Sequence, residues 1–296
     1  MLENKLKIGV QPMWGVGCLE WLRSLSKSGI VPGTVFTDNP DHNHYLTEEE
    51  WDDFFSDTRD IIIATNNVNF RNIKFHGFLL QYKPKYVEIY NNGDPAHLGI
   101  GYHDKDKFLF DVLFPKIKCK VYVKSINTKA GNTVNLDGYI LDKVQGINVK
   151  NNNAAGSTSD QTLEESIVWA KKNFNLPVLA SGGITNKNDI DNAFRYGADA
   201  VLIGTLFAVA KESNLSKESK QMLISKNSSD LKREQINNSN LLSIGTRLEN
   251  DDKNLSKNLM HTVKEGKNGI LYAGKAIDNI HAENDIKTIV SELLQQ

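Results

Sequence analysis

The chain has 296 residues, of which 40% are hydrophobic and 24% charged, and its formal net charge at pH 7 is −1. This near-zero charge provides no basic field for nucleic acid or an anionic membrane, so neither partner is expected. Two cysteines without a CxxC pair, and no apolar run of the ~18 residues that span a membrane, favour a cytoplasmic protein without disulfides or a metal site.

Short β-rich runs alternate with amphipathic stretches along most of the chain. Helices are expected at Cys18–Ser28, Thr162–Asn173 and Lys187–Tyr196. The expected strands are Lys7–Val10, Gly33–Phe36, Asp60–Ala64, Tyr86–Ile89, Lys120–Lys124, Gly138–Leu141, Pro177–Ala180 and Ala200–Ile203. Strands that alternate with helices indicate a parallel sheet with crossover connections, and eight of them favour closure. The predicted fold is therefore an α/β protein of the (β/α)8 TIM-barrel type.

The composition changes after the last expected strand. Residues 211–268 are rich in Ser, Lys, Asn and Glu, with one amphipathic helix expected at Lys217–Ile224. An apolar helical pattern returns at Asp285–Leu294. We expect residues 1–210 to form the barrel and 269–296 to complete it, with 211–268 as a helical cap over the barrel mouth. A solvated linker is the alternative for this insertion.

Paired small residues stand at the ends of the last two expected strands. Two adjacent glycines let the backbone turn sharply and approach a ligand closely. Unpaired N–H groups at a helix N-terminus favour an anion, and barrels form such sites after strands seven and eight. Either pair alone could simply form a turn, but two pairs in register predict a phosphate site. Its expected residues are Ser181, Gly182, Gly183, Gly204 and Thr205. The phosphate could belong to a cofactor or to a substrate.

Further short motifs accompany the glycine pairs. They are Pro177-Val178, Gly182-Gly183-Ile184, Gly197-Ala198-Asp199, Gly204-Thr205-Leu206-Phe207 and Glu212-Ser213, with weaker matches at Gln11-Pro12-Met13, Gln145-Gly146 and Tyr272-Ala273-Gly274. Together they resemble the FMN-dependent nitronate monooxygenases, formerly called 2-nitropropane dioxygenases, and the related FMN-dependent enoyl-ACP reductases. The resemblance implies FMN as the cofactor and a small organic substrate. It also implies that Gln11, Pro12, Met13, Asn67 and Gln145 line the flavin ring.

The chain departs from this family at the expected base. The family pattern after strand six is Gln-Gly and then Ala-Gly-Gly-His, in which the His exchanges a proton with the substrate. The best match here is Ala154-Ala155-Gly156-Ser157, which needs an insertion and places Ser157 where the His belongs. A hydroxyl cannot take up a proton near neutral pH as an imidazole does. We therefore expect weak or absent oxidation of neutral nitroalkanes unless another group acts as the base.

Lys124, at the end of the fifth expected strand, is the first candidate for that other base if burial lowers its pKa. His76 and His103 are weaker candidates. Alternatively the substrate needs no base, or the family reaction has been lost.

Three classes of function stay open. The leading one is an FMN-dependent oxidoreductase, either nitronate monooxygenase-like or an enoyl reductase that uses NAD(P)H. The second is a non-redox phosphate-binding barrel enzyme, such as an isomerase or synthase. The third is a flavin-binding protein without turnover. The sequence leaves the substrate, the electron acceptor and the oligomeric state open.

Overall fold

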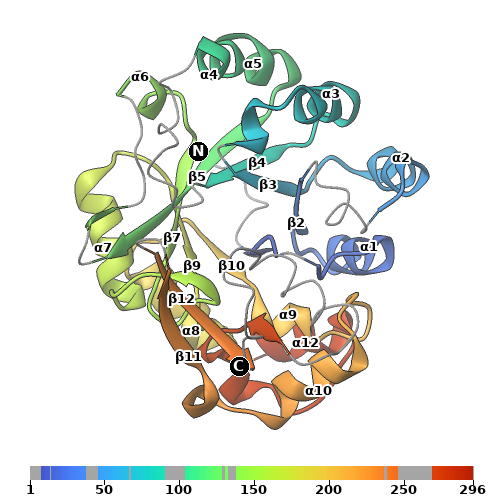
Figure 1. Ribbon diagram of the computed structural model, residues 1–296, viewed down its shortest axis with the longest axis vertical. Helices are drawn as coiled ribbons and strands as arrows, with labels where there is room; N and C mark the ends of the chain where they lie inside the picture. The colour runs from blue at the N-terminus through green and yellow to red at the C-terminus, as the bar shows by residue number, and fades with distance from the viewer. Residues whose placement is uncertain are drawn as a thin grey trace.

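The computed structural model of the protein describes residues 8–13, 15–37, 46–66, 68–90, 104–128, 131–132, 138–236, 239–245 and 269–295. Within these ranges, eight parallel strands form one sheet in the order β1-β10-β9-β7-β5-β4-β3-β2 (Figure 1). Their bounds are Ile8–Val10 (β1), Gly33–Val35 (β2), Ile62–Asn66 (β3), Tyr86–Tyr90 (β4), Lys120–Thr128 (β5), Gly146–Lys150 (β7), Val178–Ser181 (β9) and Ala200–Ile203 (β10). Parallel bridges Gly9–Val31 and Met13–Thr34 join the two edges, so the sheet closes as a barrel.

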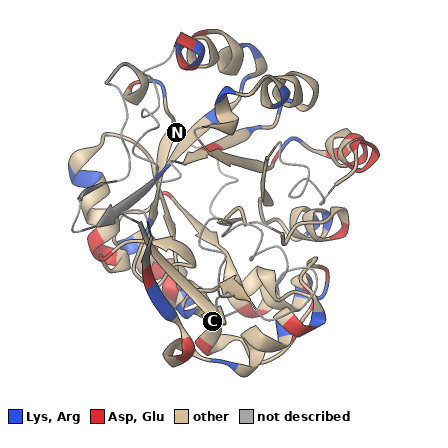
Figure 2. Cartoon of the chain, viewed as in Figure 1, with Lys and Arg blue, Asp and Glu red and all other residues tan. Residues whose placement is uncertain are grey.

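Helices surround the barrel. Their bounds are Leu19–Lys27 (α1), Glu48–Asp57 (α2), Ile73–Tyr82 (α3), Asp104–Phe108 (α4), Phe114–Ile117 (α5), Gly138–Leu141 (α6), Leu163–Asn173 (α7), Lys187–Arg195 (α8), Thr205–Ala208 (α9), Lys217–Ser225 (α10) and Ile286–Leu294 (α12), with a π-helical turn at Leu109–Leu113 (η2) and 3-10 turns at Asn69–Arg71 (η1), Ser228–Asp230 (η3) and Lys275–Asn279 (η4). Capping boxes at Thr47 and Thr162 fix where α2 and α7 begin. Charges of both signs are scattered over these helices (Figure 2).

The strands are buried on both faces, and alternate residues face the helices and the barrel interior. Ile61, just before β3, and Ile63 within it belong to the core under the helices, whereas Ile62 packs inside the barrel. The lower interior is filled by a separate apolar cluster that includes Tyr86 and Tyr122, whose rings stack at 5.8 Å. Among the described residues, this cluster fills the amino-terminal end of the barrel interior.

The predicted (β/α)8 barrel is confirmed, and seven of the eight expected strands overlap observed ones. The strand expected at Gly138–Leu141 is wrong, because these residues form α6 and the sixth barrel strand is β7 at Gly146–Lys150. The sequence of β7, GINVK, alternates apolar and polar residues, since its polar side chains point into the upper barrel.

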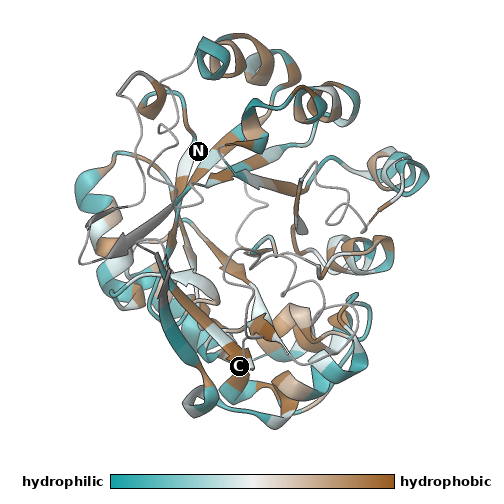
Figure 3. Cartoon of the chain, in the orientation of Figure 1, coloured by the Kyte–Doolittle hydropathy of each residue, from teal (hydrophilic) through white to brown (hydrophobic). Residues whose placement is uncertain are grey.

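The insertion is not purely helical. The expected helix is present as α10, but it is followed by two strands, β11 (Lys232–Ile236) and β12 (Ser239–Gly245). Together with β8 (Gly156–Thr158) and β13 (Ile270–Tyr272), these form a four-stranded antiparallel sheet. In Figure 3, β11 is hydrophilic and β12 largely hydrophobic, because β12 lies in the middle of this sheet. The helical interpretation of residues 211–268 is therefore wrong for this part, and 246–268 lie outside the described residues.

Candidate active site

A cavity of about 500 Å³ lies at the carboxyl ends of the barrel strands. This is the end of a barrel where βα loops build active sites. The roof is apolar and comes from α10, β12 and β13, through Leu223, Leu241 and Leu271. Ten of the predicted site residues line the cavity: Gln11, Pro12, Met13, Lys124, Ser157, Ser181, Gly182, Gly183, Gly204 and Thr205. The volume is in the range of sites that hold a cofactor or a drug-sized ligand.

The two glycine pairs meet on one wall of this cavity. Gly182 and Gly183 follow β9 with φ of +118° and +68°, a region that favours glycine. Gly204 precedes the first turn of α9, which begins at Thr205. Among the described residues, no hydrogen-bond acceptor is found for the backbone N–H groups of Gly183, Gly204 and Thr205. N–H groups without an internal acceptor at a glycine turn and at a helix start are suited to an external anion such as phosphate.

Gly182 has a different role from Gly183. A Cβ atom at Gly182 would lie 2.4 Å from Asn151 Oδ1 and 2.8 Å from the Cβ atom of Ala154. The Asn151 side chain amide also donates to the Gly182 carbonyl at 2.9 Å. Gly182 is therefore required for the loop after β7 to pack against the loop after β9. This packing brings Asn153 to Ser157 into the cavity wall.

A buried polar network forms the floor of the cavity. The side chain of Glu88 accepts hydrogen bonds from Gln11 Nε2 at 3.1 Å and from Asn148 Nδ2 at 2.5 Å. Asn148 Nδ2 also donates to Gln11 Oε1 at 2.8 Å, and Ser181 Oγ donates to Asn148 Oδ1 at 3.1 Å. The network fixes the orientation of Gln11, the one member that both faces the cavity and carries an amide able to pair with a polar ring.

Two lysines, Lys124 and Lys150, also belong to this polar floor. The Nζ atom of Lys124 lies over the ring of Tyr90, 4.1 Å from the ring centroid. Lys150, the last residue of β7, donates from Nζ to the carbonyl of Ala155. Burial lowers the pKa of Lys124, an effect that Glu88 opposes. Burial and the charge of Lys124 together hold the pKa of Lys150 well below that of an ordinary lysine, again against Glu88.

Sequence comparison decides the family. The family model described as "Nitronate monooxygenase" matches residues 138–296. The chain belongs to the nitronate monooxygenase family. Its members are flavin-dependent oxidoreductases, as the resemblance of the short motifs implied.

Similar structures agree in fold. FabK from Thermotoga maritima is 17% identical, with a TM-score of 0.74 over 99% of this chain and 92% of that one. Nitroalkane oxidase from Streptomyces ansochromogenes is 15% identical, with a TM-score of 0.68 over 97% of this chain and 94% of that one. A GMP reductase from Oceanobacillus iheyensis is 44% identical over 45 residues, which make up 15% of this chain and 14% of that relative. That short match indicates a shared segment and carries no activity with it.

The structure corrects the expected match for the Gln-Gly pair of the nitronate monooxygenase family. Gln145 does not line the cavity, because it precedes β7 and its Oε1 accepts from the Val121 amide at 2.6 Å, at the amino-terminal end of the barrel. The residue at the carboxyl end of the sixth barrel strand is Lys150. Asn67, another expected contact of the flavin ring, lies outside the described residues.

Ser157 occupies the cavity wall as expected, and it does so as part of β8, which pairs with β12. Its partner in register, Leu241, also lines the cavity. His76 lies away from it, with Nε2 3.0 Å from the Phe70 carbonyl, and His103 lies outside the described residues.

The sequence interpretation missed Glu88, Asn148 and Lys150. Each occupies the inward-facing position of an otherwise apolar strand, YVEIY in β4 and GINVK in β7. Polar residues at alternate positions of a buried strand would have indicated them.

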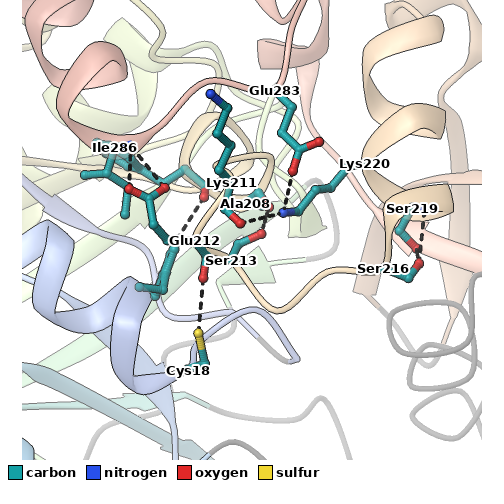
Figure 4. Close-up of polar contacts among 12 residues, drawn as sticks. Cys18, Ala208, Lys211, Glu212, Ser213, Ser216, Ser219, Lys220, Glu283 and Ile286 are labelled. Atoms are coloured by element: carbon teal, nitrogen blue, oxygen red, sulfur yellow. Dashed lines mark hydrogen bonds and ion pairs between the residues drawn. The ribbon is translucent and has the colours of Figure 1, made fainter.

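The Glu212-Ser213 pair of the family has a structural role here. Figure 4 shows Glu212 beside the start of α12, where the Ile286 amide donates to both carboxylate oxygens at 3.1 and 3.2 Å. Ser213 Oγ donates to the Ala208 carbonyl at 2.6 Å, and Cys18 Sγ donates to the Glu212 carbonyl at 3.1 Å. The pair thus joins the end of α9 to α1 and α12.

We expect Glu212→Ala to lower the stability of the fold by about 1 kcal/mol, because one orphan N–H group of α12 loses its acceptor. The melting temperature should then fall by roughly 2–4 °C. Glu292→Ala, on the exposed side of the same helix, is the control and should change it little. Equal melting temperatures for Glu212→Ala and the wild type would show that the contact contributes nothing.

In the described part of the chain, no helix is long and apolar enough to cross a membrane. No group of three or more His, Cys, Asp or Glu among those residues is placed to hold a metal ion.

Proposed function

We propose that this protein binds FMN in the cavity and uses it to oxidise a small organic substrate of the nitronate type. The observation that carries the proposal is the set of unpaired N–H groups at Gly183, Gly204 and Thr205, together on the wall of a cavity of about 500 Å³. These groups would hold the FMN phosphate. When bound, FMN would supply the redox chemistry, accepting electrons from the substrate and passing them to an acceptor such as O2.

The side chains of the cavity divide the remaining tasks. Gln11, fixed by the floor network, and the adjacent Pro12-Met13 turn would orient the flavin ring. The apolar roof of Leu215, Leu223, Leu241 and Leu271 would exclude water and accept an alkyl group of the substrate. A lysine-rich floor below an apolar roof suits a molecule with a small anionic or strongly polar head and a hydrocarbon tail.

The two cysteines, Cys18 and Cys119, are free thiols. This agrees with the cytoplasmic location that we propose.

Anaerobic reduction of the bound flavin tests the proposed substrate class. We expect an alkyl nitronate to bleach the flavin, since the anion needs no base before it is oxidised. Bleaching by NADH or NADPH but not by nitronate would identify a reductase instead. A flavin that none of these reduces would contradict the proposed reaction while leaving FMN binding in place.

A further inference from the structure

The polar floor of the cavity contains two lysines and a single carboxylate among the described residues. Lys124 and Lys150 both line the cavity, and the carboxylate is Glu88, which is 1% exposed. Its oxygens already accept hydrogen bonds from Gln11 and Asn148. A buried charge is stable only when it is paired, so one carboxylate can balance only one ammonium. We therefore expect one of the two lysines to be uncharged.

The contacts of Lys150 suit an uncharged amine. An ammonium has three N–H donors and no acceptor, whereas a neutral amine has two donors and a lone pair. Within the part of the chain that the structure describes, Lys150 Nζ has one acceptor, the Ala155 carbonyl, and forms no ion pair. Since Lys150 is only 7% exposed, water cannot easily satisfy the remaining donors. The neutral form leaves a lone pair at the cavity wall.

Lys124 has the surroundings of the charged member of the pair. Its Nζ lies 4.1 Å from the centre of the Tyr90 ring, and the face of an aromatic ring attracts a cation. Its neighbouring charge is also one of the causes that hold the pKa of Lys150 down.

Lys150 stands where a proton-transfer group would be useful. It ends the sixth barrel strand, and its Nζ contacts Ala155, two residues before Ser157. Ser157 occupies the position at which the family has its histidine. The ε-amine and the Ser157 strand therefore border the same part of the cavity.

We propose that Lys150 is a catalytic base of this protein, whose uncharged ε-amine removes the proton from the substrate carbon next to an electron-withdrawing group. In this step the C–H bond breaks and its proton forms a third N–H bond on Nζ. The electron pair stays on the substrate, so that a nitroalkane becomes a nitronate. No electrons leave the substrate, and the ammonium later returns the proton to water. The inference rests on the proposed function and extends it to neutral nitroalkanes, reversing the expectation drawn from Ser157.

The pH dependence follows from the groups that face Lys150. They are Lys124 on β5 and Glu88 on β4, and the other titratable side chains on the described cavity wall are Tyr90 and Tyr272. A base works in its deprotonated form, so the rate should rise with pH through the pKa of Lys150. Removal of the cation at Lys124 should raise that pKa and move the rise to higher pH. Removal of Glu88 should lower the pKa of Lys150 and move the rise in rate to lower pH.

Hydrogen–deuterium exchange at the α-carbon of nitroethane tests the proposal. The exchange is followed by proton NMR in D2O without oxygen, after subtraction of the buffer rate. It reports proton removal alone and does not depend on bound flavin, whose presence is scored separately from the visible spectrum. We expect Lys150→Met to lower the exchange rate by about 10²–10⁴-fold.

Two further variants separate a base from a charge. Lys150→Arg keeps a long cationic side chain that cannot deprotonate, so it should be as inactive as Lys150→Met. Lys172→Met, on the exposed surface of α7, is the control for a lysine replacement and should exchange like the wild type. Lys124→Met should still exchange, with its pH profile moved upward.

Stability provides a readout that does not involve the substrate. At pH 7 the unfolded chain carries a charged lysine where the fold holds a neutral one, and this lowers wild-type stability. Lys150→Met should therefore melt at a higher temperature than the wild type, and the gap should shrink as pH rises toward the usual lysine pKa.

The outcomes are distinct. Exchange by Lys150→Met or Lys150→Arg at the wild-type rate would overturn the proposal, and so would a wild type that does not accelerate exchange. Protein that exchanges but holds no flavin would contradict the proposed function while supporting Lys150 as a base.

Discussion

Gly204→Val should weaken FMN binding on the order of 10–100-fold while the barrel stays folded. A Cβ atom at Gly204 would lie 3.4 Å from Met13 Sδ and 3.7 Å from the Cβ atom of Gln11, both within ordinary contact distance. The fold therefore has room for the first carbon, but the branched methyl groups would enter the space from which a phosphate must reach the amides of Gly204 and Thr205. Titration of the apoprotein with FMN, followed by flavin fluorescence, measures the change.

Gly77→Val is the matched control, because Gly77 lies in α3 and a Cβ atom there would meet nothing within 4 Å. It should bind FMN like the wild type. Gly183→Val is a poorer test, since φ is +68° at Gly183 and any side chain would strain the turn. Wild-type affinity in folded Gly204→Val would place the phosphate elsewhere.

Glu88→Ala should destabilise the protein by about 3 kcal/mol or more. The substitution leaves the amides of Gln11 and Asn148 without their shared acceptor in a buried site, and it removes the carboxylate nearest to the two lysines. Urea unfolding followed by circular dichroism measures the loss. Flavin affinity should fall as well, because Gln11 would no longer be held in one orientation.

Glu88→Gln separates shape from charge. It keeps the size of the side chain and one acceptor oxygen, so it should cost less stability than Glu88→Ala. Its loss of charge should nevertheless lower the pKa of Lys150, which Glu88 raises. If Glu88→Ala unfolds at the same urea concentration as the wild type, the floor network does not stabilise this fold.

The features that were predicted from the sequence carry local signals. The glycines after β9 and the Gly204-Thr205 step stand at strand ends, where their conformational freedom marks turns that line the cavity. Helices such as α1, α7 and α12 were found close to their observed bounds, because caps and apolar periodicity are visible within a dozen residues.

The features that were missed depend on contacts between distant segments. The sheet that roofs the cavity pairs β8 with β12, joining Ser157 to Leu241, and no local pattern specifies that pairing. Likewise, the polar residues of β7 do not suggest a buried strand in the sequence. Only the closed barrel shows that Asn148 and Lys150 face its interior. Gln145 was expected after the sixth strand because that strand was assigned to Gly138–Leu141, whereas the sixth barrel strand is Gly146–Lys150.

The visible absorption spectrum of the purified protein, before and after incubation with FMN, tests the central claim most directly. We expect a flavin band that survives removal of free FMN, and an equimolar amount of FMN released on denaturation. A folded protein that stays colourless after this incubation, and to which FMN does not bind in titration, would contradict the assignment of the cavity to a flavin. It would favour a phosphorylated substrate without redox chemistry.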